Sequence, residues 1–82
     1  MPTFLLSHQH PADECPYAFA AWRGFDSPLR HAATSGSCAG SGDTHRIWWA
    51  VEAPDEGAAY ACLPPWVAER TEAERVSELR IP

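Results

Sequence analysis

The histidines and cysteines are the side chains of this sequence best suited to chemistry. His8 and His10 close the first run of alternating residues, and Cys15 follows five positions after His10. Cys38 and His45 flank a glycine-rich segment. Imidazole nitrogen and thiolate sulfur are typical donors to zinc, copper, nickel and iron rather than to magnesium or calcium. These five residues therefore predict a site for one transition metal ion more clearly than they predict any reaction.

The spacing of these residues matches no zinc-finger or CxxC pattern, so the motif alone has little specificity. His8 and His10 make a better ligand pair than two isolated histidines, because side chains two positions apart on a strand point the same way. The competing interpretation is structural, since a cysteine is often a small buried hydrophobic residue and a histidine is often hydrogen-bonded or at the surface.

Four strands and two helices are expected to position these side chains. Strands are predicted over 3–10, 32–39, 45–52 and 75–81, and helices are predicted to begin after Asp13 and Asp55. The order βαββαβ predicts a ferredoxin-like α+β sandwich that forms a single domain over 1–82. An alternative is a βαβ unit with a disordered Gly/Ser loop over 34–44.

The expected topology gathers the donors at one end of the sheet. The first and third strands of such a sandwich lie side by side and antiparallel, so His8 and His10 come near His45. A short hairpin brings the end of the second strand, with Cys38, to the same edge. The first helix starts just past the first strand, which places Cys15 there as well. We therefore expect the five donors to converge.

Two other residues of the same types are expected to lie outside this cluster. His31 precedes the second strand and so falls at the opposite end of the sheet. Cys62 continues the apolar stripe of the second helix, which favours core packing over metal binding.

Composition excludes several classes of partner. The chain has 82 residues, a net charge of −5 and six cationic residues, all of them arginine. This balance argues against binding to nucleic acid or to anionic membranes, both of which require a basic surface. We find no signal-peptide pattern and no apolar run of the roughly 20 residues that cross a bilayer. Three cysteines, an odd number, fit the reducing cytoplasm better than a disulfide framework.

The aromatic residues predict a homodimer. Four Trp, three Phe and two Tyr are many for a core of this size. Trp48 and Trp49 are adjacent on a predicted strand, so one packs under the helices and the other lies on the open face of the sheet. A second sheet packed face to face would cover that open face.

Two segments, Val51–Ala58 and Arg75–Arg80, resemble small actinobacterial nickel-binding-like domains of unknown function. The resemblance is mainly in the C-terminal half of the chain, and its motifs are mostly structural. It implies a ferredoxin-like fold, a dimer of the α+β barrel type and room for a bound transition metal such as nickel.

The leading hypothesis is a small transition-metal-binding protein that serves storage, sensing, delivery or metal-dependent catalysis. The alternative is a metal-free isomerase, cyclase or monooxygenase of the dimeric α+β barrel type. In that alternative His8 or His10 is a general acid or base, and Trp22 and Trp49 line an apolar pocket. A third hypothesis is a partner-binding module that uses exposed aromatic residues.

Overall fold

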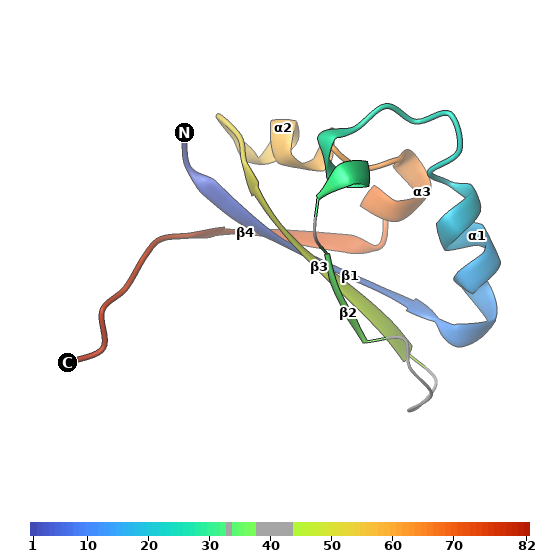
Figure 1. Ribbon diagram of the computed structural model, residues 1–82, viewed down its shortest axis with the longest axis horizontal. Helices are drawn as coiled ribbons and strands as arrows, with labels where there is room; N and C mark the ends of the chain where they lie inside the picture. The colour runs from blue at the N-terminus through green and yellow to red at the C-terminus, as the bar shows by residue number, and fades with distance from the viewer. Residues whose placement is uncertain (33, 38–43) are drawn as a thin grey trace.

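The computed structural model describes residues 1–32, 34–37 and 44–82. One antiparallel sheet, in the order β2-β3-β1-β4, carries the helices on one of its faces (Figure 1). The strands are β1 (Thr3–Pro11), β2 (Ser35–Ser37), β3 (Thr44–Glu52) and β4 (Thr71–Val76). The helices are α1 (Cys15–Ala20), α2 (Glu56–Tyr60) and α3 (Pro65–Ala68), with 3₁₀ turns η1 (Ala12–Glu14) and η2 (Pro28–His31). This α+β architecture is compatible with the predicted ferredoxin-like sandwich.

The central strand β1 alternates between the covered and the open face of the sheet. Phe4 and Leu6 are buried in the core with Trp49 of β3, as the period of two predicts. His8 and His10 continue the same face and are each only 2% exposed. The buried face of β1 therefore consists of apolar side chains in its first half and of two histidine side chains near its end.

The pairing of β1 with β3 is antiparallel, as predicted, and it places the histidines together. His10 lies directly opposite His45, and His8 lies opposite Ile47. Directly paired residues point to the same face of a sheet, with Cβ atoms about 4.5–5.5 Å apart. This register brings the end of β1 and the start of β3 to one edge of the covered face.

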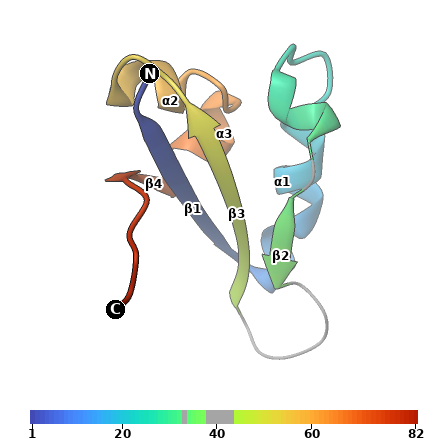
Figure 2. The same ribbon diagram turned by 60° about the vertical axis from the view of Figure 1, so that its left-hand side comes forward.

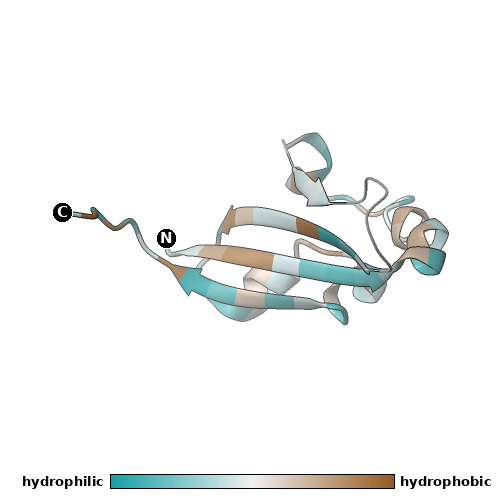
Figure 3. Ribbon diagram, turned by 90° about the horizontal axis from the view of Figure 1, so that it is seen from below, coloured by the Kyte–Doolittle hydropathy of each residue, from teal (hydrophilic) through white to brown (hydrophobic). Residues whose placement is uncertain are grey.

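The fourth strand begins earlier than predicted. The prediction of a strand over 75–81 is wrong for most of its length, since β4 spans Thr71–Val76. Val76 pairs with Thr3, the first residue of β1, so the chain beyond it has no neighbouring strand to bond. Leu79 and Ile81 are instead 79% and 89% exposed, in a tail that leaves the sheet (Figure 3).

Other element boundaries also differ from the prediction. In the described part of the chain the second strand covers Ser35–Ser37, within the predicted 32–39. Pro65 begins α3 instead of ending a helix, because proline suits the first turn, where no N–H bond is needed. Asp55 caps α2 as predicted, since its Oδ1 accepts a hydrogen bond of 2.8 Å from the Ala58 amide. None of the helices in the described part of the chain has the length and apolar character needed to cross a membrane.

The two adjacent tryptophans divide between the two faces. Trp49 is buried under the helices, whereas Trp48 is half-buried opposite Ser7 on the face without helices, which Figure 3 views from below.

The homodimer stays a prediction and can be measured. We expect sedimentation equilibrium to give twice the chain mass of 9.0 kDa. Trp48→Glu should return the mass to that of one chain, because a charge would have to be buried in the sheet-to-sheet interface. Far-UV circular dichroism serves as the control for folding of the variant. A monomeric wild type would contradict the prediction.

Candidate metal centre

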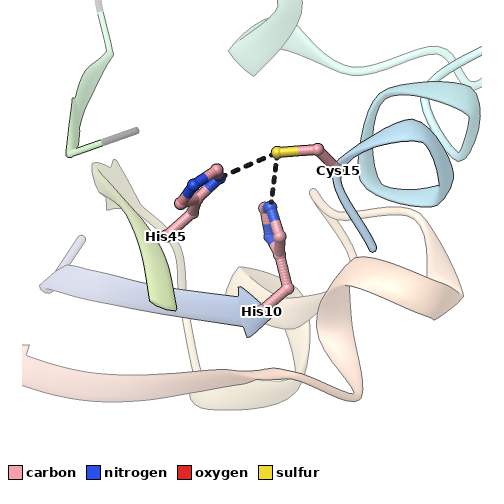
Figure 4. A group of neighbouring side chains, drawn as sticks. All are labelled: His10, Cys15 and His45. Carbon is pink, nitrogen blue, oxygen red and sulfur yellow. Dashed lines mark hydrogen bonds between the residues drawn. The ribbon is translucent and has the colours of Figure 1, made fainter. Parts of the chain in front are cut away.

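Three side chains from three elements meet at the edge where β1 ends. Cys15 Sγ lies 3.3 Å from His10 Nε2 and 2.8 Å from His45 Nδ1 (Figure 4). The three potential ligand atoms all lie within 4.8 Å of one another. His10 is buried, and Cys15 and His45 are half-buried. This cluster, His10, Cys15 and His45, could hold a metal ion.

The local sequence explains why the cluster forms. The register of β1 and β3 fixes the two histidines opposite each other, with ring centroids 5.6 Å apart. Pro11 ends β1, and the single turn η1 then leads directly into α1. Pro16 lies in the first turn of α1 and fixes the start of the helix at Cys15. The short turn leaves Cys15 above the two imidazoles.

A series of hydrogen bonds behind the cluster assigns the tautomers of two histidines. The Thr71 hydroxyl donates to the Val67 carbonyl at 2.6 Å. Its oxygen is therefore the acceptor for His8 Nδ1–H at 3.1 Å. A neutral His8 then has a lone pair on Nε2, which accepts from His10 Nδ1–H at 2.8 Å.

The same series leaves the Nε2 lone pair of His10 directed at Cys15 Sγ. This is the form in which imidazole binds a metal, with the other ring nitrogen donating its proton to a neighbouring acceptor. His8 is that acceptor, so its own Nε2 is occupied. Of the two histidines on β1, His10 thus presents a ligand atom to the cluster, and His8 orients it.

Burial and neighbouring charge keep both imidazoles neutral. Desolvation lowers the pKa of His8 below its usual value and His10 lowers it further, and these effects outweigh the opposing hydrogen bonds to the backbone of Val67 and Arg70. Desolvation also lowers the pKa of His10, with a second contribution from His45 that outweighs the opposing effect of Glu14. Arg70 lowers both pKa values slightly. A neutral imidazole is the form that can donate a lone pair to a metal.

The indole of Trp66 covers this histidine pair. Its ring centroid lies 6.2 Å from the ring centroids of both His8 and His10. The Arg70 guanidinium stacks on the Trp66 ring, 3.8 Å from its centroid. Its Nε lies 3.5 Å from a Glu14 carboxylate oxygen. Trp66 and Arg70 therefore exclude water from the histidines and fix the turn that carries Cys15.

The lowered pKa values predict that stability falls in mild acid. Well above a pH of about 6.5 both imidazoles are neutral in the folded and the unfolded chain, and the full stability is present. As the pH drops below 6.5, the unfolded chain binds protons on His8 and His10 before the folded chain does. We expect the urea midpoint to be lower at about pH 5.5 than at about pH 7.5.

The control for this pH effect is His31→Asn, because His31 is exposed in η2. That variant should show the same fall in the urea midpoint as the wild type. Equal midpoints at the two pH values in the wild type would contradict the assignment of neutral, buried imidazoles.

The geometry of the cluster fits a metal with a small expansion. In a tetrahedral site with Zn–S near 2.3 Å and Zn–N near 2.05 Å, ligand sulfur and nitrogen lie about 3.5 Å apart. The sulfur-to-nitrogen distances here are 3.3 and 2.8 Å. The distance to His10 would have to grow by about 0.2 Å and the distance to His45 by about 0.7 Å to reach that spacing. Both Cys15 and His45 lie at a half-buried edge where side chains can move.

The other sequence-predicted residues have different positions. Cys38 lies outside the described residues, so its role as a ligand stays a prediction. His31 is exposed in η2 and does not belong to the cluster. Cys62 packs beside the core, and its Sγ lies 3.7 Å from the Ala58 carbonyl oxygen, as expected for a structural cysteine.

Sequence reasoning missed Thr71, the residue that fixes the tautomers. It lies directly opposite His8 in the pairing of β1 with β4. Its signal is weak, because it stands at the start of a segment rich in glutamate and arginine that resembles a solvated surface. A strand predicted to begin at 71 would have placed Thr71 and Ala73 on the covered face.

Comparison with known proteins identified no relative of this chain. The resemblance to nickel-binding-like domains therefore stays a prediction. No protein-family model, no curated protein and no solved structure matches the chain.

Proposed function

We propose that this protein binds one transition metal ion per chain through His10, Cys15 and His45. The observation that carries the proposal is the convergence of these three donor atoms from β1, α1 and β3. The series from Val67 through Thr71 and His8 supports it, because it presents a neutral His10 Nε2 to the same point. His8 has the role of orienting His10, in place of the ligand role expected from its spacing.

The donor set narrows the class of metal. Two imidazoles and one thiolate favour zinc, copper, nickel or iron, and they disfavour magnesium and calcium, which take oxygen ligands. Among the described residues the cluster supplies three ligands, and a tetrahedral ion has four positions. Such an open position is the arrangement of sites where a metal polarises a substrate or activates water. A cysteine ligand is most easily kept reduced in the cytoplasm, the compartment predicted from the sequence.

The direct test is metal analysis of protein purified without a histidine tag. We expect close to one equivalent of zinc, copper, nickel or iron per chain, or uptake of one equivalent after the apo-protein is dialysed against each metal. Cobalt(II) titration should give a sulfur-to-metal charge-transfer band, which reports thiolate coordination directly. Absence of metal on purification and of uptake on dialysis would reject the proposal.

A second candidate function is metal-free enzyme chemistry at the same cluster. The observation that favours it is the 2.8 Å separation of Cys15 Sγ and His45 Nδ1, within reach for proton transfer that would leave a nucleophilic thiolate. Trp22 and Trp49 also line an apolar cavity nearby, as this alternative expects. Rapid alkylation of Cys15 in chelator-treated protein, slowed by His45→Gln, would favour this candidate. Protection of Cys15 by one equivalent of metal would favour the metal site.

A further inference from the structure

An apolar cavity opens between α1 and the sheet on the side of the candidate metal centre. Its volume is about 290 Å³, and its aromatic walls include Phe19, Trp22 and Trp49. The rings of Trp22 and Trp49 lie 5.8 Å apart at an interplanar angle of 55°. This volume suits a ring system smaller than a typical drug-sized ligand.

The cavity and the metal cluster use the same side of α1 and the same face of β3. On α1, Phe19 lies one helical turn after Cys15, so both side chains project from one side of the helix. On β3, Ile47 follows His45 by two positions and shares its face. Each element thus contributes one residue to the cluster and one residue to the cavity lining. These two residues are separated by roughly 6–7 Å along the axis of α1 or β3.

The charge of the cavity lining selects the ligand. Arg30 is the one charged residue among the described lining residues, and none of them is acidic. Arg30 belongs to η2, and Figure 2 shows this turn near the top of the view, at the opposite end from the start of β3. Its Nη1 donates to the Phe25 carbonyl at 3.2 Å, and no described carboxylate lies within salt-bridge distance of it. Toward the described residues, the other guanidinium N–H groups of Arg30 make no hydrogen bond or ion pair that would compete with an anion.

We propose that this cavity binds a flat aromatic carboxylate. The ring packs among Phe19, Trp22 and Trp49, and the carboxylate pairs with Arg30. The opposite edge of the ring then faces His45 and Cys15, beside the candidate metal centre. This last placement rests on the proposed function, whereas the ring and carboxylate contacts do not. A larger groove of about 540 Å³ lies over Trp48 on the open face, where the predicted dimer would cover it.

The test uses calorimetric titration of the full chain with 2-naphthoate and with its neutral match, 2-naphthamide. We expect 2-naphthoate to bind metal-free protein, and to bind about threefold to fivefold more tightly than the amide, since the ion pair with Arg30 is exposed. Arg30→Gln should abolish this preference. Arg23→Gln is the matched control, because Arg23 is exposed and lies outside the described cavity lining.

The aromatic wall has its own matched pair on α1. Phe19 and Tyr17 are both 64% exposed, and of the two only Phe19 lines the cavity. We expect Phe19→Ser to weaken 2-naphthoate binding about fivefold or more and Tyr17→Ser to leave it unchanged. Neither residue is buried, so both variants should fold.

Three results would overturn the proposal: no binding of 2-naphthoate up to its solubility limit, equal affinity for acid and amide, or equal effects of the two serine variants. Each can be read in metal-free protein, so failure here is distinct from failure of the metal proposal. Repeating the titration with zinc-loaded protein then asks whether metal and aromatic acid interact.

Discussion

Cys15→Ser is expected to abolish tight metal binding. Cys15 supplies the one sulfur among the three described donors, and its Sγ lies 2.8 Å from His45 Nδ1. Loss of a partner that merely orients a ligand costs about 10- to 100-fold in metal affinity, so loss of the ligand itself should cost more. Competition titration against a chromophoric zinc chelator measures the affinity, and the cobalt(II) charge-transfer band should disappear.

Cys62→Ser is the matched control for this experiment. It makes the same chemical change at a cysteine that packs beside the core, away from the cluster. Its metal affinity should equal that of the wild type. Equal loss in both variants, or no loss in Cys15→Ser, would contradict the proposed ligand set. Cys38→Ser extends the comparison, since an affinity loss as large as that of Cys15→Ser would make Cys38 the fourth ligand.

The convergence of His10, Cys15 and His45 could be predicted from sequence, because it depends on the order of the strands and on the alternation of side chains between the two faces of the sheet. Alternation from Phe4 to His10 fixes which residues of β1 face the helices, and antiparallel pairing with β3 then brings His10 to His45. The acidic residues and Pro16 mark the helix start that carries Cys15. These local signals predict a cluster of five donors without a ligand motif, and the structure brings three of them together, His10, Cys15 and His45.

The division of roles between His8 and His10 could not be predicted in the same way. Both lie on the same face of β1 and look equivalent as ligands. Their difference arises from Thr71, whose position opposite His8 requires β4 to start at 71. Only 71–74 alternates in the way a half-buried strand does, with Thr71 and Ala73 on one face and two glutamates on the other. Arg75 and Val76 break the alternation, and the high charge of the segment obscures the strand.

Thr71→Val is expected to lower both the stability of the fold and its affinity for metal. Valine has nearly the shape of threonine but removes the hydroxyl that links His8 to the Val67 carbonyl. His8 Nδ1–H then loses the hydroxyl as its acceptor, whereas the Val67 carbonyl still accepts from the Arg70 amide at 3.0 Å. A buried donor left unsatisfied costs about 1–3 kcal/mol. We expect the free energy of unfolding to fall by about 2 kcal/mol, measured by urea denaturation of the metal-free protein.

The effect on metal affinity has a separate cause, the direction of the hydrogen bonds. With Thr71 in place, His8 must accept the proton of His10 Nδ1, which leaves the lone pair on His10 Nε2. In the valine variant His8 can adopt the other tautomer and donate from Nε2, so that His10 carries its proton on Nε2, where the metal would bind. We expect affinity to fall about 10- to 100-fold, and ¹⁵N NMR of the imidazoles to show the change of tautomer at His10.

Thr71→Ser separates this mechanism from a general loss of packing. Serine keeps the hydroxyl and removes a methyl group, so it should retain the tautomer and most of the metal affinity while losing some stability. Thr34→Val controls for the chemical change at an exposed threonine. If Thr71→Ser lost as much metal affinity as Thr71→Val, packing at Thr71 would control the site. Rescue by serine, together with the NMR signature, would identify the hydroxyl proton of Thr71 as the group that sets His10 for metal binding.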